Sequence, residues 1–310
     1  MSQIKVNEIS DTGGYSMLGR HNRIINGAMM IDQRNAGASV PLPAATDKWV
    51  ADRWVMQSHS GGIGQRISAT IAMGSPYSLK YTSTTSSAFF QMGQQIEYLN
   101  MSDFQSQTIT ISFWAKANNS NTGSTNFVVR TRTSTTPNAA IRFSGANSDT
   151  SVTISTTAQR YQVTRSIASG VSALSIEFVL GSHVSGDGFE ITGVQVEKGN
   201  VATPFEFRQY GHELALCQRY FEAGSAPPVY FQASTFAYSS ATVYYKQEKR
   251  ANPTVGIFAN GVSNRIAITD TPTYDTNLFV NGNTAGVAVI GLTNLYRVKV
   301  EFNYTASAEL

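Results

Sequence analysis

One change of parity near the middle of the chain constrains the fold more than any other feature. In the segment GDGFEITGVQVEKGN, Phe189 and Ile191 fall on one face of an extended strand, whereas Val194 and Val196 fall on the opposite face. The change occurs at Gly193. An extra residue inserted there as a β-bulge returns all four apolar side chains to one core. The sequence therefore predicts a long strand with a bulge at Gly193.

The spacing of the apolar residues changes after this strand. Leu214, Cys217 and Phe221 recur at the spacing of one helix face, which predicts a linking helix within residues 208–223. Cys217 is the only cysteine and lies on the apolar side, so we expect a buried thiol rather than a nucleophile. A chain of 310 residues is too long for one ordinary core, and this helix marks the boundary between two domains.

Residues 21–207 are predicted to form an all-β domain. Apolar and polar side chains alternate most clearly over residues 108–115. Further candidate strands are residues 127–132, 140–143, 152–154, 161–164 and 174–180. Clusters of Gly, Asn and Ser separate these segments at the spacing typical of a β-sandwich.

Residues 224–310 are predicted to form a smaller C-terminal β domain. Residues 296–304 alternate like a half-buried strand. The dipeptides Asn260-Gly261 and Asn281-Gly282 suit hairpin turns. Several aromatic residues occur in the first half of this domain: Tyr230, Phe231, Phe236, Tyr238, Tyr244 and Tyr245. A small sheet this rich in aromatics needs the helix or a neighbouring subunit across it.

Four blocks of the sequence resemble a known protein domain. They read NRIINGAMMIDQRNAG, KWVADRWVM, TITISFWAKA and FEITGVQVEKGNVATPFEFR, and together they span nearly all of residues 22–207. The combination is similar to the jelly-roll, carbohydrate-binding-module-like domain of phage tail fibres and related virion proteins. The segment YGHELALCQRYFE is similar to the helix that follows this domain in many tail fibre proteins. The resemblance implies a virion component that contacts host-surface glycan, commonly as a trimer.

The first twenty residues are predicted to be an attachment arm. Ile4 and Val6 alternate with polar residues, and a glycine-rich joint follows at residues 11–14. A terminal strand without a local partner commonly pairs with another protein, here another virion tail protein. A frayed tail is the alternative.

One of the blocks departs from the pattern of related jelly rolls. Glycan-binding jelly rolls of this kind often begin Asn-Gly-Asp/Asn-Phe-Glu, and those carboxylates help to hold a structural calcium ion. Residues 26–30 of this chain read NGAMM instead. Asp32, Asp187 and Glu190 remain as oxygen donors if the first and last strands meet, but calcium needs six or more ligands. We expect no cofactor, with methionine side chains filling the space.

The sequence lacks the patterns of common catalytic sites. Its histidines lie in four different predicted elements: His21, His59, His183 and His212. No glycine-rich phosphate loop is present, and a single cysteine allows no Cys/His metal cluster. Glycan cleavage needs two carboxylates about 5–10 Å apart, and Glu190 and Glu197 lie on either side of the expected bulge. We therefore expect no enzyme.

Charge and hydropathy exclude further classes of partner. The formal net charge is only +3, which does not favour nucleic acid. No apolar run approaches the roughly 18–20 residues of a membrane span, so no membrane insertion is expected. The first twenty residues lack the apolar core of a secretion signal, which predicts synthesis in the host cytoplasm.

Aromatic side chains are the best candidates for binding sugar, because a ring packs on sugar C–H faces while polar groups bond the hydroxyls. Trp114 points away from the apolar face of its strand, onto the outer side of the sheet. Packing beneath a loop or a sister subunit is the alternative. Tyr238, Tyr244 and Tyr245 combine a flat ring with a polar tip. These four residues are the predicted glycan contacts.

Two other groups of residues have competing interpretations. Trp49 and Trp54 flank an Asp-Arg pair, which favours a packed corner with Arg53 against an indole over a ligand site. Lys246, Lys249 and Arg250 follow the tyrosines. They either meet an acidic polysaccharide or envelope phosphate, or are simply solvated charges.

The sequence thus predicts an all-β protein, a jelly-roll β-sandwich followed by a linking helix and a smaller C-terminal β domain. The predicted segments are residues 1–20, 21–207, 208–223 and 224–310. The predicted role is a virion tail protein, a homotrimer attached through residues 1–20, that binds host-surface polysaccharide or glycolipid. A capsid decoration or tail-assembly protein without glycan binding is one alternative, and a glycan-degrading enzyme is another.

Overall fold

The chain divides into two compact units, residues 1–209 with Leu310 and residues 210–309. This is a computed structural model. It describes residues 22–72, 74–119, 127–145, 147–225, 229–231, 239–259, 262–263, 266–268, 273–275, 278–291 and 298–310. The predicted arm, residues 1–20, lies outside these ranges.

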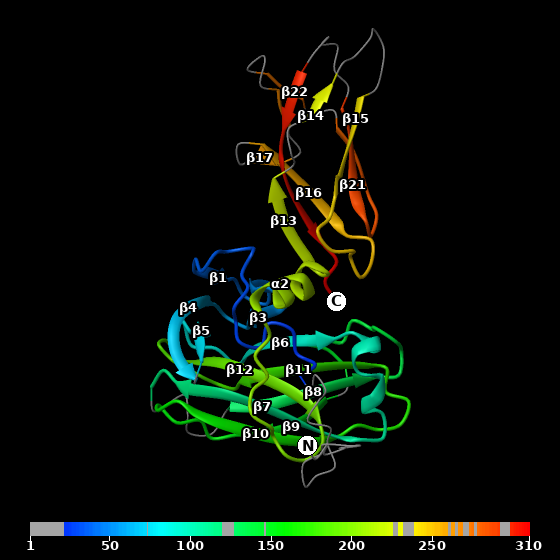
Figure 1. The fold of residues 1–310 in the computed structure, drawn as a ribbon. Coiled ribbons are helices and arrows are strands. Elements are labelled where there is room, and N and C mark those ends of the chain that lie inside the picture. The colour runs from blue at the N-terminus through cyan, green and yellow to red at the C-terminus, as the bar shows by residue number, and fades with distance from the viewer. Residues whose placement is uncertain are drawn as a thin grey trace, which may run out of the picture. The chain divides into compact units, whose positions relative to one another are not determined.

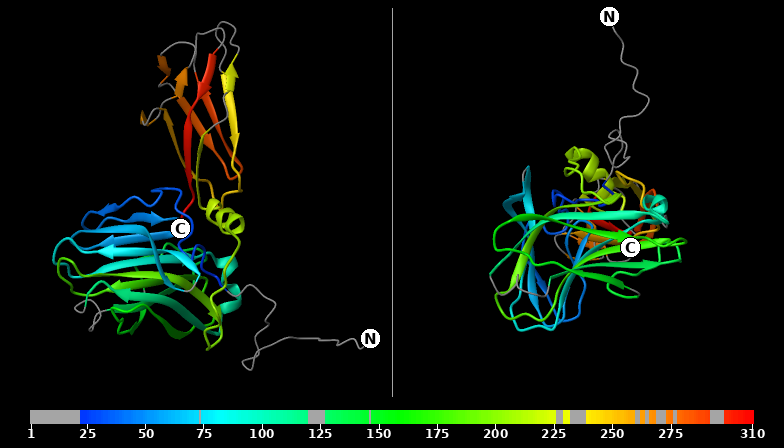
Figure 2. Two further views of the ribbon diagram at one scale, coloured as in Figure 1. Left: turned by 60° about the vertical axis from the view of Figure 1, so that its left-hand side comes forward. Right: turned by 90° about the horizontal axis from the view of Figure 1, so that it is seen from below.

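The first unit is a jelly-roll β-sandwich of two antiparallel six-stranded sheets that lie face to face (Figures 1 and 2). One sheet has the order β1 (Val40–Leu42), β4 (Gly62–Ala72), β5 (Ser75–Thr82), β12 (Gly188–Lys198), β7 (Thr108–Ala117), β10 (Gln159–Ser166). The other has the order β2 (Lys48–Ala51), β3 (Trp54–Ser58), β6 (Phe90–Ile96), β11 (Ala173–Leu180), β8 (Phe127–Ser134), β9 (Asn147–Ser151). Hydrogen-bonded neighbours are mostly distant in sequence, so the chain crosses repeatedly between the sheets.

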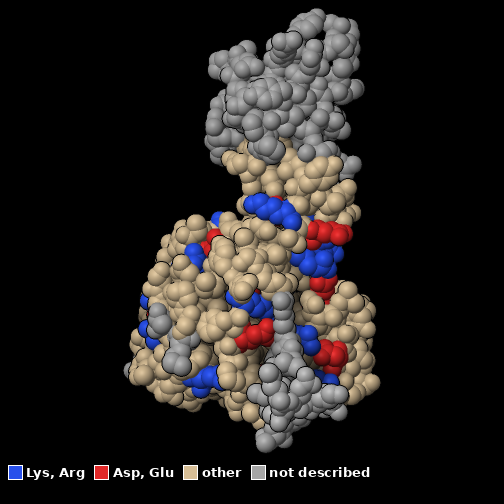
Figure 3. Space-filling model, in the orientation of Figure 1, with Lys and Arg blue, Asp and Glu red and all other residues tan. Residues whose placement is uncertain are grey.

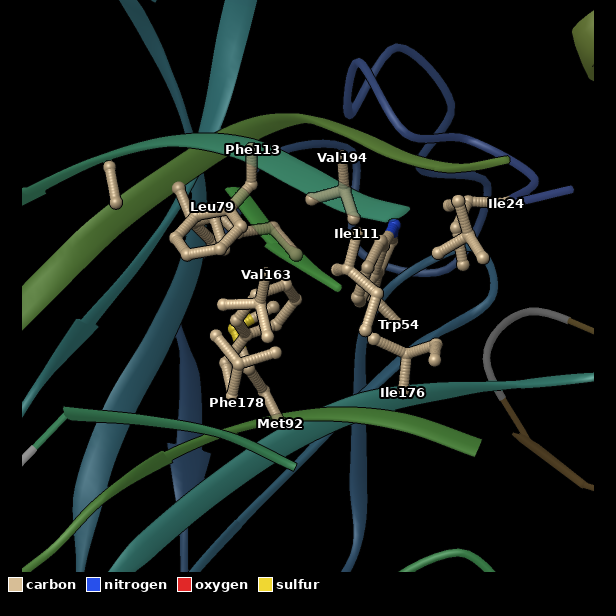
Figure 4. Packing of buried hydrophobic residues seen from close by; sticks show 14 of the residues in the cluster. Ile24, Trp54, Leu79, Met92, Ile111, Phe113, Val163, Ile176, Phe178 and Val194 are labelled. Carbon is tan, nitrogen blue, oxygen red and sulfur yellow. The ribbon is translucent and has the colours of Figure 1, made fainter. Parts of the chain in front are cut away.

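Strand periodicity builds the core between the sheets. In β7 and β11 alternate side chains point inward, and Ile111, Phe113, Ile176 and Phe178 are fully buried. The rings of Phe113 and Phe178 meet edge to face, with centroids 4.8 Å apart. Figure 4 shows these four side chains converging with Trp54 between the sheets. Fully burying side chains of this size contributes about 1.5–3 kcal/mol each.

The predicted bulge in β12 is confirmed. Its pairing with β7 shifts register between Thr192 and Gln195, and Gly193 has φ of +60°. A left-handed backbone favours glycine, which has no Cβ to clash. The four apolar side chains on either side of the bulge, Phe189, Ile191, Val194 and Val196, are all fully buried.

The start of the described chain closes against this bulged strand. The Arg23 amide donates to the Val196 carbonyl (2.9 Å), and the Val194 amide donates to the Gly27 carbonyl (3.0 Å). A Cβ on Gly27 would stand 2.2 Å from the Val194 carbonyl oxygen, so only glycine allows this approach. The buried Asn26 amide bonds the backbone of Ile31, which fixes the turn. Two of the four resemblance blocks therefore meet directly.

Some strand predictions were wrong. Residues 140–143 form a turn: Phe143 has φ of +61°, and its amide donates to a Glu177 carboxylate oxygen instead of a strand carbonyl (2.9 Å). Residues 152–154 lie beyond the end of β9. Strands β4, β5 and β6 were not predicted.

The second unit begins with helix α2 (Tyr210–Gln218), which is shorter than predicted because β13 starts at Phe221. Cys217 is fully buried as a free thiol, as expected. The described residues that follow form three antiparallel sheets. The first sheet has the order β13 (Phe221–Ser225), β23 (Asn303–Ser307), β16 (Thr254–Ala259), β17 (Val262–Ser263). The second has the order β14 (Val229–Phe231), β22 (Val298–Glu301), β18 (Ile266–Ile268), β19 (Thr273–Asp275). The third has the order β15 (Ser239–Tyr244), β21 (Gly286–Gly291), β20 (Leu278–Gly282).

The hairpins of this unit differ in detail from the prediction. β20 pairs with β21 as expected, but Asn281 and Gly282 belong to the strand. The turn lies at residues 283–286, where the Asn283 side chain accepts the amides of Ala285 and Gly286. β16 pairs with β17, whereas β18 pairs with β19 and β22; Asn260 and Gly261 lie outside the described residues. The predicted strand 296–304 divides at Phe302 into β22 and β23.

Among the described residues, no helix has the length and apolar character needed to cross a membrane.

Replacing Gly27 with alanine tests the closure of the sandwich. The added Cβ must displace the Val194 carbonyl, so we expect a loss of about 2 kcal/mol or more, which lowers the melting temperature by roughly 4–8 °C. Thermal unfolding followed by circular dichroism measures the shift. Gly211→Ala in helix α2 is the control, because its Cβ would meet nothing within 4 Å and alanine favours a helix, so no loss is expected. Equal shifts for the two variants would contradict this packing.

Candidate functional site

Trp114 lies on the outer side of its sheet, as predicted, but it is half-buried. A Cβ built on Gly193 would meet the Trp114 ring at 3.1 Å and Phe205 at 3.9 Å. The segment that leaves β12 follows the same outer face. There Thr203 donates its amide to Glu197 (3.0 Å), and its carbonyl accepts from Arg160. The alternative interpretation therefore fits better: Trp114 packs beneath the chain's own exit segment.

The tryptophan corner is a packed corner, as predicted. Trp54 is fully buried and donates its indole N–H to the Asn26 carbonyl (2.9 Å). Arg53 is also buried, and its guanidinium donates to the Gln95 carbonyl. The guanidiniums of Arg34 and Arg142 lie 5.1 and 4.9 Å from the ring centroid of Trp49.

The three calcium candidates bind nitrogen donors in separate places. Asp32 accepts the amides of Asn35 and Gly37 and lies 3.6 Å from the Arg66 guanidinium. Asp187 accepts the Asn119 amide group and the Val184 backbone amide. Glu190 lies 3.2 Å from the Lys116 ammonium. Within the described part of the chain, no three His, Cys, Asp or Glu side chains are placed to share a metal ion. Of the two methionines expected to fill the space, Met29 is fully buried in the core and Met30 is half-buried.

The neighbouring tyrosines at the end of β15 have opposite environments. Tyr244 is 77% exposed, whereas Tyr245 is 8% exposed. Strand alternation separates them, since successive side chains point to opposite faces. Tyr244 stands opposite Gly286 in β21, so no side chain on the partner strand covers it at that position. Tyr238 lies outside the described residues, so Tyr244 is the predicted contact that presents an open ring.

Tyr245 belongs to a buried ionic cluster that the sequence analysis missed. Lys249 and Glu222 are fully enclosed, with 2.7 Å between the ammonium nitrogen and a carboxylate oxygen. The ammonium also donates to the carbonyls of Gln218 and Gln247, so all three of its N–H groups are bonded. Tyr304 donates to the other Glu222 oxygen (2.6 Å). A buried charge pair is tolerated when its remaining donors and acceptors are satisfied in this way.

This cluster holds the Tyr244 end of the sheet in place. The Lys249 ammonium lies 4.5 Å above the Tyr245 ring, and the rings of Tyr245 and Tyr304 are 6.1 Å apart. The backbone amides of Tyr245 and Lys249 donate to carbonyls in the 283–286 turn. A rigid strand end therefore presents Tyr244 outward. Tyr245 was wrongly predicted as a glycan contact, because it faces the interior.

Burial shifts the acid–base behaviour of the cluster. Desolvation raises the pKa of Tyr245 to about 12, with help from the negative charge of Glu222. Desolvation also raises the pKa of Tyr304, which gives its hydrogen bond to Glu222. Desolvation lowers the pKa of Lys249, and Glu222 opposes that shift. At neutral pH the phenols therefore stay protonated.

The predicted basic group does not form a cationic surface. Lys249 is internal, and the Arg250 guanidinium donates to the carbonyls of Ala308 and Glu309. Lys246 is the exposed member of the three. On the face shown in Figure 3, charged side chains are scattered among uncharged residues. The exposed ring of Tyr244 can therefore stack on the C–H face of a sugar. Residues 246–248 and Asn283 are also exposed and supply polar side chains.

Comparison with known proteins finds similarity at the level of solved structures. No protein-family model matches the sequence, and no curated protein matches it either. The enzymatically active domain of tailspike protein 4 of bacteriophage CBA120 is 16% identical over 57% of this chain and 21% of that one, with a TM-score of 0.38. TmCBM61, solved with β-1,4-galactotriose, is 11% identical over 58% of this chain and 99% of that one, with a TM-score of 0.35.

A third similar structure is the CBM22-1 xylan-binding domain of Xyn10C from Paenibacillus barcinonensis. It is 14% identical over 54% of this chain and 99% of that one, with a TM-score of 0.33. This chain thus spans about one fifth of the tailspike domain and nearly all of the two binding modules. At this level of similarity, a functional assignment has to rest on the residues of the chain itself.

Replacing Lys249 with methionine tests the buried cluster. The change leaves the Glu222 charge without its counter-ion, so we expect the second unit to lose about 3–5 kcal/mol of unfolding free energy, measured by denaturant titration. Adding Glu222→Leu to the same chain should recover part of the loss, since no unpaired charge then remains. Lys246→Met is the surface control, with an expected change within about 0.5 kcal/mol. A loss below about 1 kcal/mol for Lys249→Met would show that the pair is unimportant.

The raised tyrosine pKa values predict a loss of stability in alkali. Above about pH 10 an unfolded tyrosine releases its proton, whereas native Tyr245 and Tyr304 keep theirs until higher pH. The native state then binds more protons than the unfolded state, so stability falls as pH rises from about 10 to 12. Tyr245→Phe should weaken this dependence, at little cost at pH 7, because the Tyr245 hydroxyl bonds no described group. Unfolding curves at pH 8 to 12 measure the effect, and identical slopes for variant and wild type would contradict it.

Proposed function

We propose that this protein is a structural virion component, a phage tail fibre or fibre-like protein, that binds glycan on the host surface. The observation that carries the binding role is Tyr244, an aromatic side chain left 77% exposed on a paired strand. Its strand end is anchored by the fully buried Glu222–Lys249 pair. A ring fixed in advance loses little conformational freedom when a sugar stacks on it.

A binding role fits the described residues better than a hydrolytic one. Ser87, His183 and Asp187 are the residue types of a catalytic triad and line one hollow of the sandwich. However, His183 donates Nδ1–H to the Gly181 carbonyl (2.6 Å), which leaves Nε2 to accept the Tyr81 hydroxyl (2.9 Å). Neither imidazole nitrogen is directed at a serine, as nucleophilic catalysis requires.

The carboxylates considered for glycan cleavage also have structural partners. Glu197 accepts the amide and hydroxyl of Thr203. Glu190 faces the Lys116 ammonium across the strand pair. We therefore propose a protein without catalytic activity, which presents rigid surfaces.

The virion assignment draws on the resemblance of the four sequence blocks. In the structure these blocks contact one another, through β12 against the 22–27 segment and through Trp54 against Asn26. Their residues thus specify one sandwich fold. In our proposal residues 1–20 attach this fold to the particle, and a trimer multiplies shallow sugar contacts into useful avidity.

Tyr244→Ala tests the glycan-binding role. Removing the ring should weaken binding to host-surface polysaccharide roughly tenfold or more, because a contact of 1.5–3 kcal/mol is lost at each site. Surface plasmon resonance on immobilised host polysaccharide measures the change. Tyr245→Phe is the matched control, since it alters the adjacent tyrosine on the buried side and should bind like wild type.

Two results would replace the proposal with its alternatives. If the wild-type protein binds no polysaccharide or glycolipid of the host even at high avidity, a decoration or assembly protein is the better assignment. If it releases reducing sugar from host envelope extract, it is an enzyme. Unchanged binding by Tyr244→Ala would remove Tyr244 from the site.

A further inference from the structure

The sandwich unit carries an open hollow whose lining includes none of the predicted glycan contacts. Its volume is about 560 Å³, within the roughly 300–1,000 Å³ of small-molecule sites. Two connecting segments form it, one between β5 and β6 and the other between β11 and β12. The lining residues are Ser86, Ser87, Ala88, Ser182, His183, Val184 and Asp187.

Backbone hydrogen bonds join the two segments into one rigid rim. Ser87 and His183 exchange both of their backbone hydrogen bonds, at 2.9 and 3.0 Å. Ser83 donates its amide to the Asp187 carbonyl and accepts the Gly186 amide. The Asp187 carboxylate also accepts the Val184 amide (2.9 Å). The hollow is therefore preformed and needs no ordering of loops before a ligand binds.

Core side chains fix the position of His183, which lines the hollow. The His183 ring is fixed by the Gly181 carbonyl on one nitrogen and by the Tyr81 hydroxyl on the other. The Tyr81 ring stacks on Phe90, with centroids 3.6 Å apart. Both rings are fully buried, so the position of His183 is tied to the hydrophobic core.

The lining selects for a particular ligand chemistry. Asp187 supplies a carboxylate whose two oxygens accept hydrogen bonds from Asn119 and Val184 and retain further acceptor capacity. Serine hydroxyls line the same hollow, and no lysine or arginine is among its described lining residues. Such a site favours ligands that donate hydrogen bonds and disfavours anions. Val184 is 50% exposed and adds an apolar contact.

We propose that this hollow is a second carbohydrate site that binds one uncharged sugar residue. A sugar hydroxyl donates to the Asp187 carboxylate, and the C–H face of the ring lies against Val184. Uronic and other acidic sugars are excluded by the Asp187 charge. The inference rests on the proposed function, because it takes the ligand to be sugar, but the site is separate from Tyr244.

The experiment uses the full-length chain carrying Tyr244→Ala, so that residual binding reports on the hollow. The probes are the methyl glycosides of glucose, galactose, mannose and N-acetylglucosamine, together with the methyl glucuronide and galacturonide. Ligand-observed NMR titration gives the dissociation constants. We expect at least one neutral glycoside to bind and the matching uronide to bind at least tenfold more weakly.

Two variants in this background locate the site. Val184→Ala should weaken the neutral sugar about three- to tenfold, whereas Val201→Ala, which changes another half-exposed valine (54%), should have no effect. Asp187→Asn should reduce the preference for neutral sugar over uronide about tenfold, a change in charge selectivity that loss of packing alone would not produce.

The outcomes separate this inference from the proposed function. If the chain without Tyr244→Ala binds none of the probes and no host glycan, both fail. If the chain that retains Tyr244 binds a neutral sugar and Tyr244→Ala abolishes that binding, the second site alone is overturned. The same holds if Val184→Ala and Asp187→Asn leave the binding of the probes unchanged.

Discussion

The sandwich depends on one local constraint, the close approach of the 22–27 segment to the bulged strand β12. The bulge at Gly193 is what allows apolar residues of opposite parity in one strand to face the same core. Directly after the bulge, the backbone groups of Val194 and Val196 form hydrogen bonds with the 22–27 segment. Gly27 is the point where the two backbones come closest. First and last segments of the domain are thereby joined, which leaves the connecting segments free to form surfaces.

The second unit is stabilised differently from the sandwich, because its sheets are small and its core contains a buried ion pair. The Lys249 ammonium bonds the last carbonyl of α2 and the Glu222 carboxylate of β13, so one side chain connects helix and sheet. Tyr304 in β23 donates a hydrogen bond to the other oxygen of the Glu222 carboxylate. A well-packed apolar group can be equally stable at such a place, but a fully bonded charge pair accepts only one arrangement of its partners. The outward direction of Tyr244 follows from that fixed arrangement.

The sequence predicted those parts of the fold that periodicity records. Strand β7, strand β11 and the bulge at Gly193 could be identified because their inward positions are apolar. Strand β4 could not, since two of its inward positions are glycines, Gly62 and Gly64, which make room for Tyr81 and Met56. Residues 140–143 form a turn instead of the predicted strand because their backbone amides bond side chains of β6 and β11, a tertiary effect that the local sequence does not record. In the site, alternation could have separated Tyr244 from Tyr245, but nothing local marked Lys249 as buried. Its partner Glu222 lies 27 residues away.

We propose that this protein acts by presenting rigid, strand-built surfaces to sugar and leaves the sugar unchanged. The most direct test incubates the protein with purified polysaccharide of a susceptible host, separates bound from free material, and measures the chain length of the bound glycan by mass spectrometry. We expect the glycan to be retained on the protein and recovered at its original length. Shortened glycan, or glycan that is never retained, would contradict it.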